Sequence, residues 1–513
     1  MEFIENHLLS LILFSPTIAA IIMLLLPGKH VKAFRWGALA ASLIPFVLTL
    51  VVWFNFSPTP DAASPFQFEE QTTWYAAINA SYHLGVDGIS LTMVLLTTLL
   101  TPLAILASFS ITERVKAYMI LFLLLETGML GVFLSLDLML FFVFWEVGLV
   151  PMYFLIAQWG GANRNYASLK FILYTMGGSL GLLLAIQLMG VVVGSFDLVT
   201  LTEKWPVIDS LAVPIGISLE TVKTIAFWAF VIAFAIKVPI WPFHTWLPDA
   251  HTEAPTAGSM ILAGVLLKLG AYGFLRLVLP FFPVEAQRFA WVLALLAVAS
   301  IIFGALGALA QNDFKRLVAY SSINHMGFVV LGIAAAAYTW NTTSAQTILD
   351  RNIALNGAVL QMFNHGLSAA GMFFLVGVIY ERTHTRDLKE MGGLYAILPV
   401  YGTVLIFTAM ASLGLPGLNG FVSEFLVVRG VWPIFTLATA LSMIGLFFTG
   451  AYILKALKLV LHGPLNSRWE GKLKDITVRE LVVMAPLMAL MLLIGVWPSW
   501  LLNVINQAVA FLF

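Results

Sequence analysis

The sequence contains no cysteine, few charged residues and no excess of either sign of charge. The absence of cysteine among 513 residues excludes disulfides, thiolate zinc sites and cysteine-ligated iron–sulfur clusters in this chain. Charged residues make up only 10% and cancel to a formal net charge of zero, so nothing favours a nucleic-acid partner. Hydrophobic residues make up 60%, and the mean hydropathy is +0.95. A soluble domain of this length needs far more surface charge, so we expect a membrane protein with many spans.

Long apolar runs dominate the sequence. A helix needs about 20 mostly apolar residues to cross a bilayer, and fourteen such runs are separated by polar breaks. Strands of a β-barrel would appear as short alternating segments instead. The expected fold class is an all-α polytopic membrane protein with about 14 transmembrane helices. The expected spans, numbered 1 to 14, are about 8–27, 36–54, 88–110, 116–134, 138–157, 169–194, 222–243, 256–276, 289–310, 315–338, 355–380, 397–428, 431–456 and 479–508.

Lysine and arginine are distributed unevenly between the expected loops. Of the 26 in the chain, 18 lie in or beside the odd-numbered loops and six in or beside the even-numbered ones; Lys237 and Lys268 fall inside spans. Cytoplasmic loops of membrane proteins carry an excess of these residues. The bias predicts that the odd loops are cytoplasmic and that both termini lie outside. The start, MEFIENHLLS, lacks the positive region of a signal peptide, so the first apolar run is expected to be retained.

Seven ionisable residues are expected within spans, where each costs about 2.5–3.5 kcal/mol on insertion scales. Groups of these types, linked by water, can transfer protons. No phosphate-binding loop of the type G-x-x-x-x-G-K-[ST] is present, so the sequence gives no sign that ATP drives the chain. The seven lie in spans 4, 5, 7, 8, 10, 11 and 12, and they are Glu126, Glu146, Lys237, Lys268, His325, His365 and Glu424.

Each of these residues also has a plainer explanation. A lone buried histidine can be a hydrogen-bonded packing residue, and two histidines can ligate a b-type haem. Glu126, or a pair of Glu146 and Lys237, can serve the structure alone. The complete set is harder to explain in this way, so we favour a polar axis through the membrane interior.

Two expected spans contain helix-breaking residues: Pro239 and Pro242 in span 7, and Pro416 and Gly417 in span 12. Proline removes a helix donor, and the freed backbone groups need protein or water partners inside a membrane. Pro239 and Pro416 are 177 residues apart, and LGAY and TGAY, each in the following span, are 180 apart. This spacing predicts two inverted five-helix repeats, spans 4–8 and 9–13, each with a broken helix, as is typical of a transport site. The expected units are residues 1–115, 116–276, 289–456 and 457–513.

Five stretches are distinctive: FFVFWEVGLVPMYFLIAQWGG, FAIKVPIWPFHTWLPDAHTEAPTAGSMILAGVLLKLGAYG, DFKRLVAYSSINHMGF, NHGLSAAGMFF and GLPGLNGFVSEF. Together they resemble the antiporter-like subunits of respiratory complex I, the NADH-quinone oxidoreductase, over about residues 85–460. The resemblance implies fourteen core helices with two inverted repeats, which agrees with the count from hydropathy. The first two spans and the last are similar to the family only in hydropathy.

The resemblance also implies roles for the ionisable residues. Glu146 matches the glutamate that pairs with the lysine of span 7, here Lys237, and Lys268 matches a lysine of the central axis. His325 and His365 match histidines that lead toward the second half-channel, which ends at Glu424. Glutamate at that last position indicates the subunit M branch of the family, because the sister subunits L and N and the related Mrp antiporter subunits usually carry lysine there. The role of Glu126 is less settled in the family.

The function implied by this resemblance is proton translocation in the membrane arm of complex I, coupled to electron transfer from NADH to quinone in partner subunits. This chain is expected to bind no redox cofactor, with FMN, iron–sulfur clusters and quinone held by those partners. The expected partners are other membrane-arm subunits, especially L and N, with lipids and protons. The expected location is the bacterial inner membrane, with both termini periplasmic. The alternatives are an Mrp-type cation/proton antiporter subunit, the same module in a ferredoxin- or hydrogenase-linked complex, and, less favoured, a carrier of an organic solute.

Overall fold

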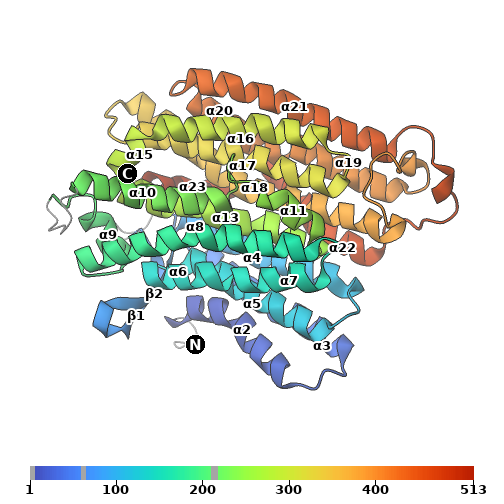
Figure 1. Ribbon diagram of the computed structural model, residues 1–513, viewed down its shortest axis with the longest axis horizontal. Helices are drawn as coiled ribbons and strands as arrows, with labels where there is room; N and C mark the ends of the chain where they lie inside the picture. The colour runs from blue at the N-terminus through green and yellow to red at the C-terminus, as the bar shows by residue number, and fades with distance from the viewer. Residues whose placement is uncertain (1–5, 59–64, 210–217, 513) are drawn as a thin grey trace.

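The computed structural model describes residues 6–58, 65–209 and 218–512. Its long helices lie side by side along a common direction (Figure 1). Within the described ranges, 13 helical segments are long and apolar enough to cross a membrane. They are α2 (Leu8–Leu25), α3 (Val31–Asn55), α4 (Gly88–Ala107, extended to Ser110), α5 (Val115–Leu134), α6 with α7 (Leu138–Val147 and Leu149–Trp159), α8 (Arg164–Val193), α10 (Leu219–Lys237), α12 to α14 (Thr256–Phe281), α16 (Ala290–Ala310), α17 (Phe314–Tyr338), α18 (Ala345–Thr383), α21 (Thr436–Leu461) and α22 (Val478–Val496).

The remaining expected span, the twelfth, consists of two shorter helices. Helix α19 (Pro399–Leu413) and helix α20 (Asn419–Val431) are separated by a segment that contains Pro416 and Gly417. The expected count of fourteen is thus met by 13 continuous spans and this interrupted one. The inverted relation between the two halves, and the boundaries of the four units, stay predictions.

Two expected spans differ in detail from the structure. Span 14 is not one helix: α22 ends at Val496 and a separate α23 (Ser499–Ala510) follows, because Pro498 has no N–H to continue the helical ladder. Span 8 contains two π-helical turns, Leu262–Leu266 and Phe274–Val278, on either side of α13 (Leu267–Gly273). Such turns insert residues into an α-helix and are frequent at functional sites.

A β-hairpin between spans 2 and 3 was not expected from the sequence. Strands β1 (Gln67–Tyr75) and β2 (Ala80–Val86) pair antiparallel, and the turn closes at Asn79, whose φ of 54° is a left-handed value that asparagine tolerates. Glu70 of β1 accepts hydrogen bonds from the backbone N–H groups of Leu9 and Ser10, at 2.7 and 3.1 Å. Its carboxylate therefore satisfies the start of α2, where helix N–H groups lack partners.

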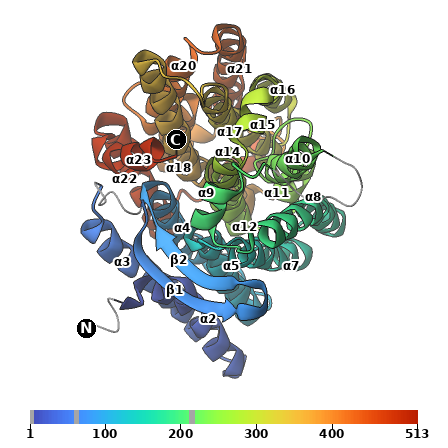
Figure 2. The ribbon, with the colours of Figure 1, turned by 90° about the vertical axis from the view of Figure 1, so that its left-hand side faces the viewer.

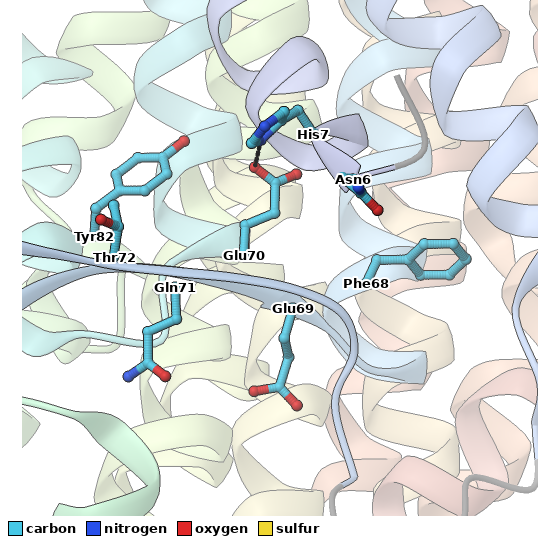
Figure 3. Close-up of a pocket in the computed structure, with 8 residues that line it drawn as sticks. All are labelled: Asn6, His7, Phe68, Glu69, Glu70, Gln71, Thr72 and Tyr82. Carbon is cyan, nitrogen blue, oxygen red and sulfur yellow. Dashed lines mark ion pairs between the residues drawn. The ribbon is translucent and has the colours of Figure 1, made fainter. Parts of the chain in front are cut away.

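Figure 3 shows a surface hollow beside this cap, of about 460 Å³, where the imidazole of His7 lies 3.8 Å from the carboxylate of Glu70. The hollow is open and lies on the hairpin, outside the spans that carry the predicted site. We therefore treat it as part of the attachment between the hairpin and α2.

One end of the helix bundle carries the hairpin and the short helices α9 (Leu198–Lys204) and α15 (Pro283–Arg288), together with the C-terminus (Figures 1 and 2). These elements belong to even-numbered loops. The start of α2 lies at the same end, because Glu70 bonds to it. The alternation of loops between the two ends therefore agrees with the expected topology.

The most deeply buried spans are the eighth, tenth and eleventh. All of the apolar window of α12 to α14 and of α18 is buried, and 94% of that of α17, against 33–39% for α2, α3 and α22. These three central spans carry Lys268, His325 and His365. The fold thus places ionisable side chains where protein surrounds them.

Candidate functional site

The seven ionisable residues expected within spans lie on seven different helices. Six of them are at most 4% exposed, and Glu146 is half-buried. Buried groups of this kind are costly in a membrane unless another group or water compensates them. Their positions are Glu126 on α5, Glu146 on α6, Lys237 at the end of α10, Lys268 on α13, His325 on α17, His365 on α18 and Glu424 on α20.

Lys237 is the last residue of α10. An irregular segment follows, which contains Pro239 and Pro242, and helix resumes as α11 (Trp246–Glu253). The Nζ atom of Lys237 has no hydrogen-bond partner among the described residues, and it lies 5.0 Å from the centre of the Trp145 ring. The lysine is therefore held beside a cation-binding aromatic face rather than in a hydrogen-bond network.

The pairing of Glu146 with Lys237 that the resemblance implied is not a direct contact in this structure. Glu146 is close enough for its charge to act on Lys237, but the described residues include no ion pair between them. One carboxylate oxygen of Glu146, Oε1, is buried without a hydrogen-bond partner in the same part of the chain. The ring of Trp145 lies beside Lys237, and its indole donates a 3.0 Å hydrogen bond to Ser179.

The second half of the set forms a continuous line of contacts. Lys268 Nζ lies 2.7 Å from His365 Nδ1 and donates to the carbonyl of Ala263 at 2.5 Å. The ring of His365 faces that of His325, with centroids 5.6 Å apart. His325 Nδ1 in turn lies 2.7 Å from Glu424 Oε1. Four residues from four helices are thus linked across the buried centre.

Hydrogen bonds surround the Glu424 end of this line. Gln361 donates to Glu424 Oε1 at 3.0 Å, and its own amide oxygen accepts a hydrogen bond of 2.5 Å from Ser423. The hydroxyl of Tyr452 lies 3.3 Å from His325 Nε2. Three of the four ring nitrogens of His325 and His365 therefore have protein partners, which favours hydrogen bonding over the haem ligation considered from the sequence.

Glu126 lies apart from this line. It is completely buried on α5, and neither carboxylate oxygen has a hydrogen-bond partner within the described chain. Nearby, α5 crosses the junction of α6 and α7 so closely that a Cβ on Gly128 would lie 2.7 Å from the Cα of Gly148. The structure gives Glu126 a position near Glu146's helix but no contact that defines a role.

His251 on α11 is a buried titratable residue that the sequence analysis did not select. It is completely buried, neither ring nitrogen has a hydrogen-bond partner among the described residues, and the ring stacks on Phe373 at 4.3 Å. It lies close enough to Lys268 and Lys315 for their charges to act on its ring. Its position in the distinctive stretch HTWLPDAHTEAPT, directly after the break at Pro242, was the available signal.

A cavity of about 220 Å³ opens near His251 at the end of the bundle opposite to the hairpin. Glu253, Lys315 and Arg386 contribute to its lining. Lys315 donates to the carbonyl of Ala254, and Arg386 contacts Glu253 and forms an ion pair of 3.1 Å with Asp313. A cavity lined by charged residues therefore opens near His251 from the side of the odd-numbered loops.

The second break, around Pro416 and Gly417, lies close to Glu424. Gly417 has a φ of 94°, which favours glycine, and a Cβ on Gly495 of α22 would lie 2.2 Å from its carbonyl oxygen. Glu424 Oε2, which has no hydrogen-bond partner among the described residues, faces Gly414 of the same break. Each broken segment thus lies next to an ionisable residue, Lys237 in the first half and Glu424 in the second.

Comparison with known proteins identifies the family. A family described as NADH:quinone oxidoreductase/Mrp antiporter, TM, matches residues 135–453. NADH-quinone oxidoreductase subunit M of Rhodobacter capsulatus is 42% identical over 99% of this chain and 96% of its own length. The chain belongs to the NADH-quinone oxidoreductase subunit M family. The identification of the subunit M branch from Glu424 is therefore confirmed.

Two further similar proteins agree with this assignment. NAD(P)H-quinone oxidoreductase chain 4 1 of Synechococcus elongatus is 42% identical over 95% of this chain and 88% of its own length. Among solved structures, a chain of respiratory complex I from Thermus thermophilus is 27% identical, has a TM-score of 0.83, and is matched over 98% of this chain and 99% of its own. These similarities cover almost the whole chain, including the N-terminal spans that resembled the family only in hydropathy.

Proposed function

We propose that this chain translocates protons in the membrane arm of an NADH:quinone oxidoreductase. The observation that carries the proposal is the buried line from Lys268 through His365 and His325 to Glu424, with separations of 2.7 Å at both ends. Histidine can accept a proton on one ring nitrogen and release one from the other, so it is suited to join a lysine to a carboxylate. Membership of the subunit M family supports the same function.

In this mechanism, protons enter from the cavity near Lys315 and Glu253 and reach Lys268 through His251. They then pass to His365, to His325 and to Glu424. Water is required between the two histidine rings, because no hydrogen bond joins their ring nitrogens among the described residues, although the ring centroids lie 5.6 Å apart. Buried polar atoms along the line that have no partner among the described residues, such as His365 Nε2 and Glu424 Oε2, are suitable partners for such water.

Glu146 and Lys237 act as the control element of this mechanism. A charged lysine in a membrane is costly without a partner, so Lys237 holds its proton more readily when the charge of Glu146 is near. The two residues are separated in this structure, with Trp145 beside the lysine. An approach of Glu146 would favour the charged lysine, and its retreat would release the proton toward Lys268.

The wider assignment follows from the same proposal. The chain binds no redox cofactor of its own, and FMN, iron–sulfur clusters and quinone belong to partner subunits. Its neighbours in the membrane arm are subunits L and N, and its two termini face the periplasm. The 3:1 distribution of lysine and arginine toward the odd loops supports this orientation.

The test uses the assembled complex in membrane vesicles with Lys237→Ala and Glu146→Ala. Both variants are expected to assemble and to translocate fewer protons per electron than the wild type. Lys32→Ala is the matched control, since it removes one lysine charge from an exposed position and should leave the ratio unchanged. Normal ratios in both test variants would remove this pair from the mechanism.

The proteins that accompany the chain in mild detergent distinguish the proposal from its alternatives. Co-purification with peripheral subunits that oxidise NADH supports it. Co-purification with other antiporter subunits alone indicates an Mrp-type complex, and a ferredoxin- or hydrogen-oxidising partner indicates the related redox complexes.

A further inference from the structure

The helix break after Lys237 displaces two backbone hydrogen bonds next to this lysine. In a continuous helix, the N–H of Ile240 would bond to the carbonyl of Ile236, and that of Trp241 to the carbonyl of Lys237. Instead, Ile240 donates to the carbonyl of Ala235 at 2.7 Å, and Pro239 and Pro242 have no N–H to offer. The carbonyl of Ile236 and the N–H of Trp241 must therefore find other partners.

Two side chains supply these partners. The indole Nε1 of Trp246 donates to the carbonyl of Ile236 at 2.8 Å, and the N–H of Trp241 donates to the hydroxyl oxygen of Ser300 at 2.9 Å. Trp246 and Ser300 are both almost fully buried, whereas Trp241 is 37% exposed. The break thus reaches the surface of the bundle, where lipid cannot satisfy a free N–H group.

The two contacts come from two different helices that follow the break in the chain. Trp246 lies in α11, directly after the break. Ser300 lies in the middle of α16, beyond the next span, and its own hydroxyl proton is donated to the carbonyl of Leu296 at 2.8 Å. On the other side, Gly270 of α13 packs so closely that a Cβ there would lie 3.0 Å from the Cβ of Lys237. The backbone around Lys237 is therefore fixed by three separate helices.

We propose that Ser300 and Trp246 are positioning residues for Lys237: they replace the two hydrogen bonds lost at the break and so fix the place of the lysine relative to Trp145 and Glu146. The inference rests on the proposed function of Lys237. Loss of either contact leaves a buried polar group unpaired and favours a looser break. The proline at position 242 disfavours a helical conformation of Trp241, so the helix does not simply close again.

The experiment measures proton translocation per electron, and its pH profile, in the assembled complex. Ser300→Ala and Trp246→Phe each remove one hydrogen-bonding group; Trp246→Phe also leaves a smaller ring in a buried position, which the Trp205→Phe control matches. Both are expected to lower the ratio and to shift the pH at which coupling is half-maximal, because the surroundings of Lys237 change. Ser300→Thr, which keeps the hydroxyl, is expected to retain most of the wild-type ratio.

Two matched controls separate positioning from packing. Ser442 is also buried and donates to the carbonyl four residues earlier, at 2.8 Å, and no further contact of its hydroxyl is seen in the described chain. Trp205 is fully buried, and its indole N–H has no hydrogen-bond partner among the described residues. Ser442→Ala and Trp205→Phe should therefore leave the ratio and the pH profile unchanged.

A second measurement reports on the break itself. The chain has no cysteine, so a cysteine in place of Phe243 is the only thiol of this subunit available to a water-soluble maleimide. Removal of one hydrogen bond of this kind corresponds to roughly a tenfold change in the population of the loosened form. The labelling rate of Phe243→Cys should rise about tenfold in the Ser300→Ala background and stay constant with Ser442→Ala.

The results distinguish this inference from the function on which it rests. If Lys237→Ala lowers the ratio while Ser300→Ala and Trp246→Phe leave ratio, pH profile and labelling unchanged, the positioning role is wrong and the function stands. If Lys237→Ala itself translocates protons normally, the proposed role of Lys237 fails, and a rise in labelling in the Ser300→Ala background then shows only that the contact fixes the break. If the two test variants do not assemble, the Ser300→Thr variant and the labelling of detergent-solubilised subunit decide the question.

Discussion

At the scale of single residues, His365 holds the most demanding position of the buried line. It has Lys268 on one side and the ring of His325 on the other, and its Nε2 atom has no hydrogen-bond partner among the described residues. An amide side chain can replace the hydrogen bond to the lysine, but it cannot gain and lose a proton near neutral pH. The two functions of the imidazole can therefore be separated by substitution.

His365→Gln is expected to preserve assembly and to reduce proton translocation per electron about as strongly as Lys268→Ala. The reason is that glutamine keeps a polar contact with Lys268 but interrupts proton transfer. His384→Gln is the control, because His384 is exposed at the C-terminal end of the same helix, α18. A normal ratio in His365→Gln would mean that the line conducts without this residue.

His83 is a second informative residue, and it lies outside the spans on β2. Its ring nitrogens form hydrogen bonds with Asp197 at 2.8 Å and with Glu69 at 3.0 Å, and so connect the hairpin to the start of α9. Burial opposes a charge on the ring, but the hydrogen bonds and charges of Asp197 and Glu69 outweigh it and raise the pKa of His83 above 6.5. The pKa of Asp197 is lowered: burial would raise it, but the hydrogen bonds from His83 and from Thr200 dominate.

The sign of the pH effect follows from these shifts. A raised pKa in the folded state means that the His83 contacts contribute fully below about pH 6.5 and are lost as pH rises through the folded-state pKa. We therefore expect the wild type to unfold at a higher temperature than His83→Gln at pH 6, with the difference shrinking toward pH 9. Comparison of the two proteins at each pH cancels other pH effects. If the difference in Tm between the two proteins is the same at pH 6 and pH 9, the prediction that a charged His83 ring stabilises the fold is wrong.

At the scale of elements, the crossing of α5 with the junction of α6 and α7 depends on two glycines. A Cβ on Gly128 would lie 2.7 Å from both the Cα and the N of Gly148, which are backbone atoms that cannot rotate away. Gly128→Ala should therefore separate the helices that carry Glu126 and Glu146. Overpacking of this kind typically costs about 1–3 kcal/mol.

Gly177→Ala is the matched control for this prediction. Gly177 lies in helix α8 with nothing within 4 Å of its missing Cβ, so alanine should be neutral or stabilise by up to about 1 kcal/mol. The measurement is the thermal unfolding of the purified subunit or complex, with the amount of assembled complex in membranes as a second readout. Equal stability of the two variants would show that the crossing tolerates a methyl group.

The elements also show what can be read from the sequence. Apolar runs of about 20 residues located the spans, because a helix of this length satisfies its own backbone groups across the lipid, whereas barrel strands would be shorter and alternating. Prolines marked the segments between Lys237 and Trp246 and between Leu413 and Asn419. The hairpin was missed because its strands are short, largely polar and placed in a loop, and the π-helical turns around Lys268 carry no proline or other visible signal.

The buried ionisable residues could be predicted from the sequence more readily than their contacts. Ionisable residues stand out within apolar runs, so all seven ionisable residues could be chosen from the sequence. Their partners could not, because contacts such as Lys268 with His365 join residues 97 positions apart through helix packing. For the same reason the lack of an ion pair between Glu146 and Lys237 in the described chain, and the position of His251, became visible only in three dimensions.

At the scale of the whole molecule, basic residues of the odd loops have a structural as well as a topological role. Lys116 donates to the carbonyls of Leu24 and Leu26 at 2.9 and 2.7 Å, and Lys455 to those of Leu309 and Gln311 at 2.7 and 2.8 Å. Each lysine thus satisfies carbonyls at the C-terminal end of a neighbouring helix, where positive charge is favoured. The excess of lysine and arginine at this end therefore agrees with a cytoplasmic orientation. These residues also have a structural reason to be at this end, because they satisfy helix carbonyls.

Orientation can be measured with single cysteines, since the chain has none of its own. Ser467 and Asn341 are exposed in the loops after spans 13 and 10, which lie at opposite ends of the bundle. If the charge bias sets the topology, a membrane-impermeant maleimide should label Asn341→Cys from the outside of right-side-out vesicles and Ser467→Cys only in inverted ones. The reverse pattern would place both termini in the cytoplasm, and with them the hairpin and α9. The cavity beside Lys315 would then face outward, and the direction of proton transfer proposed from Lys268 to Glu424 would have to be reversed.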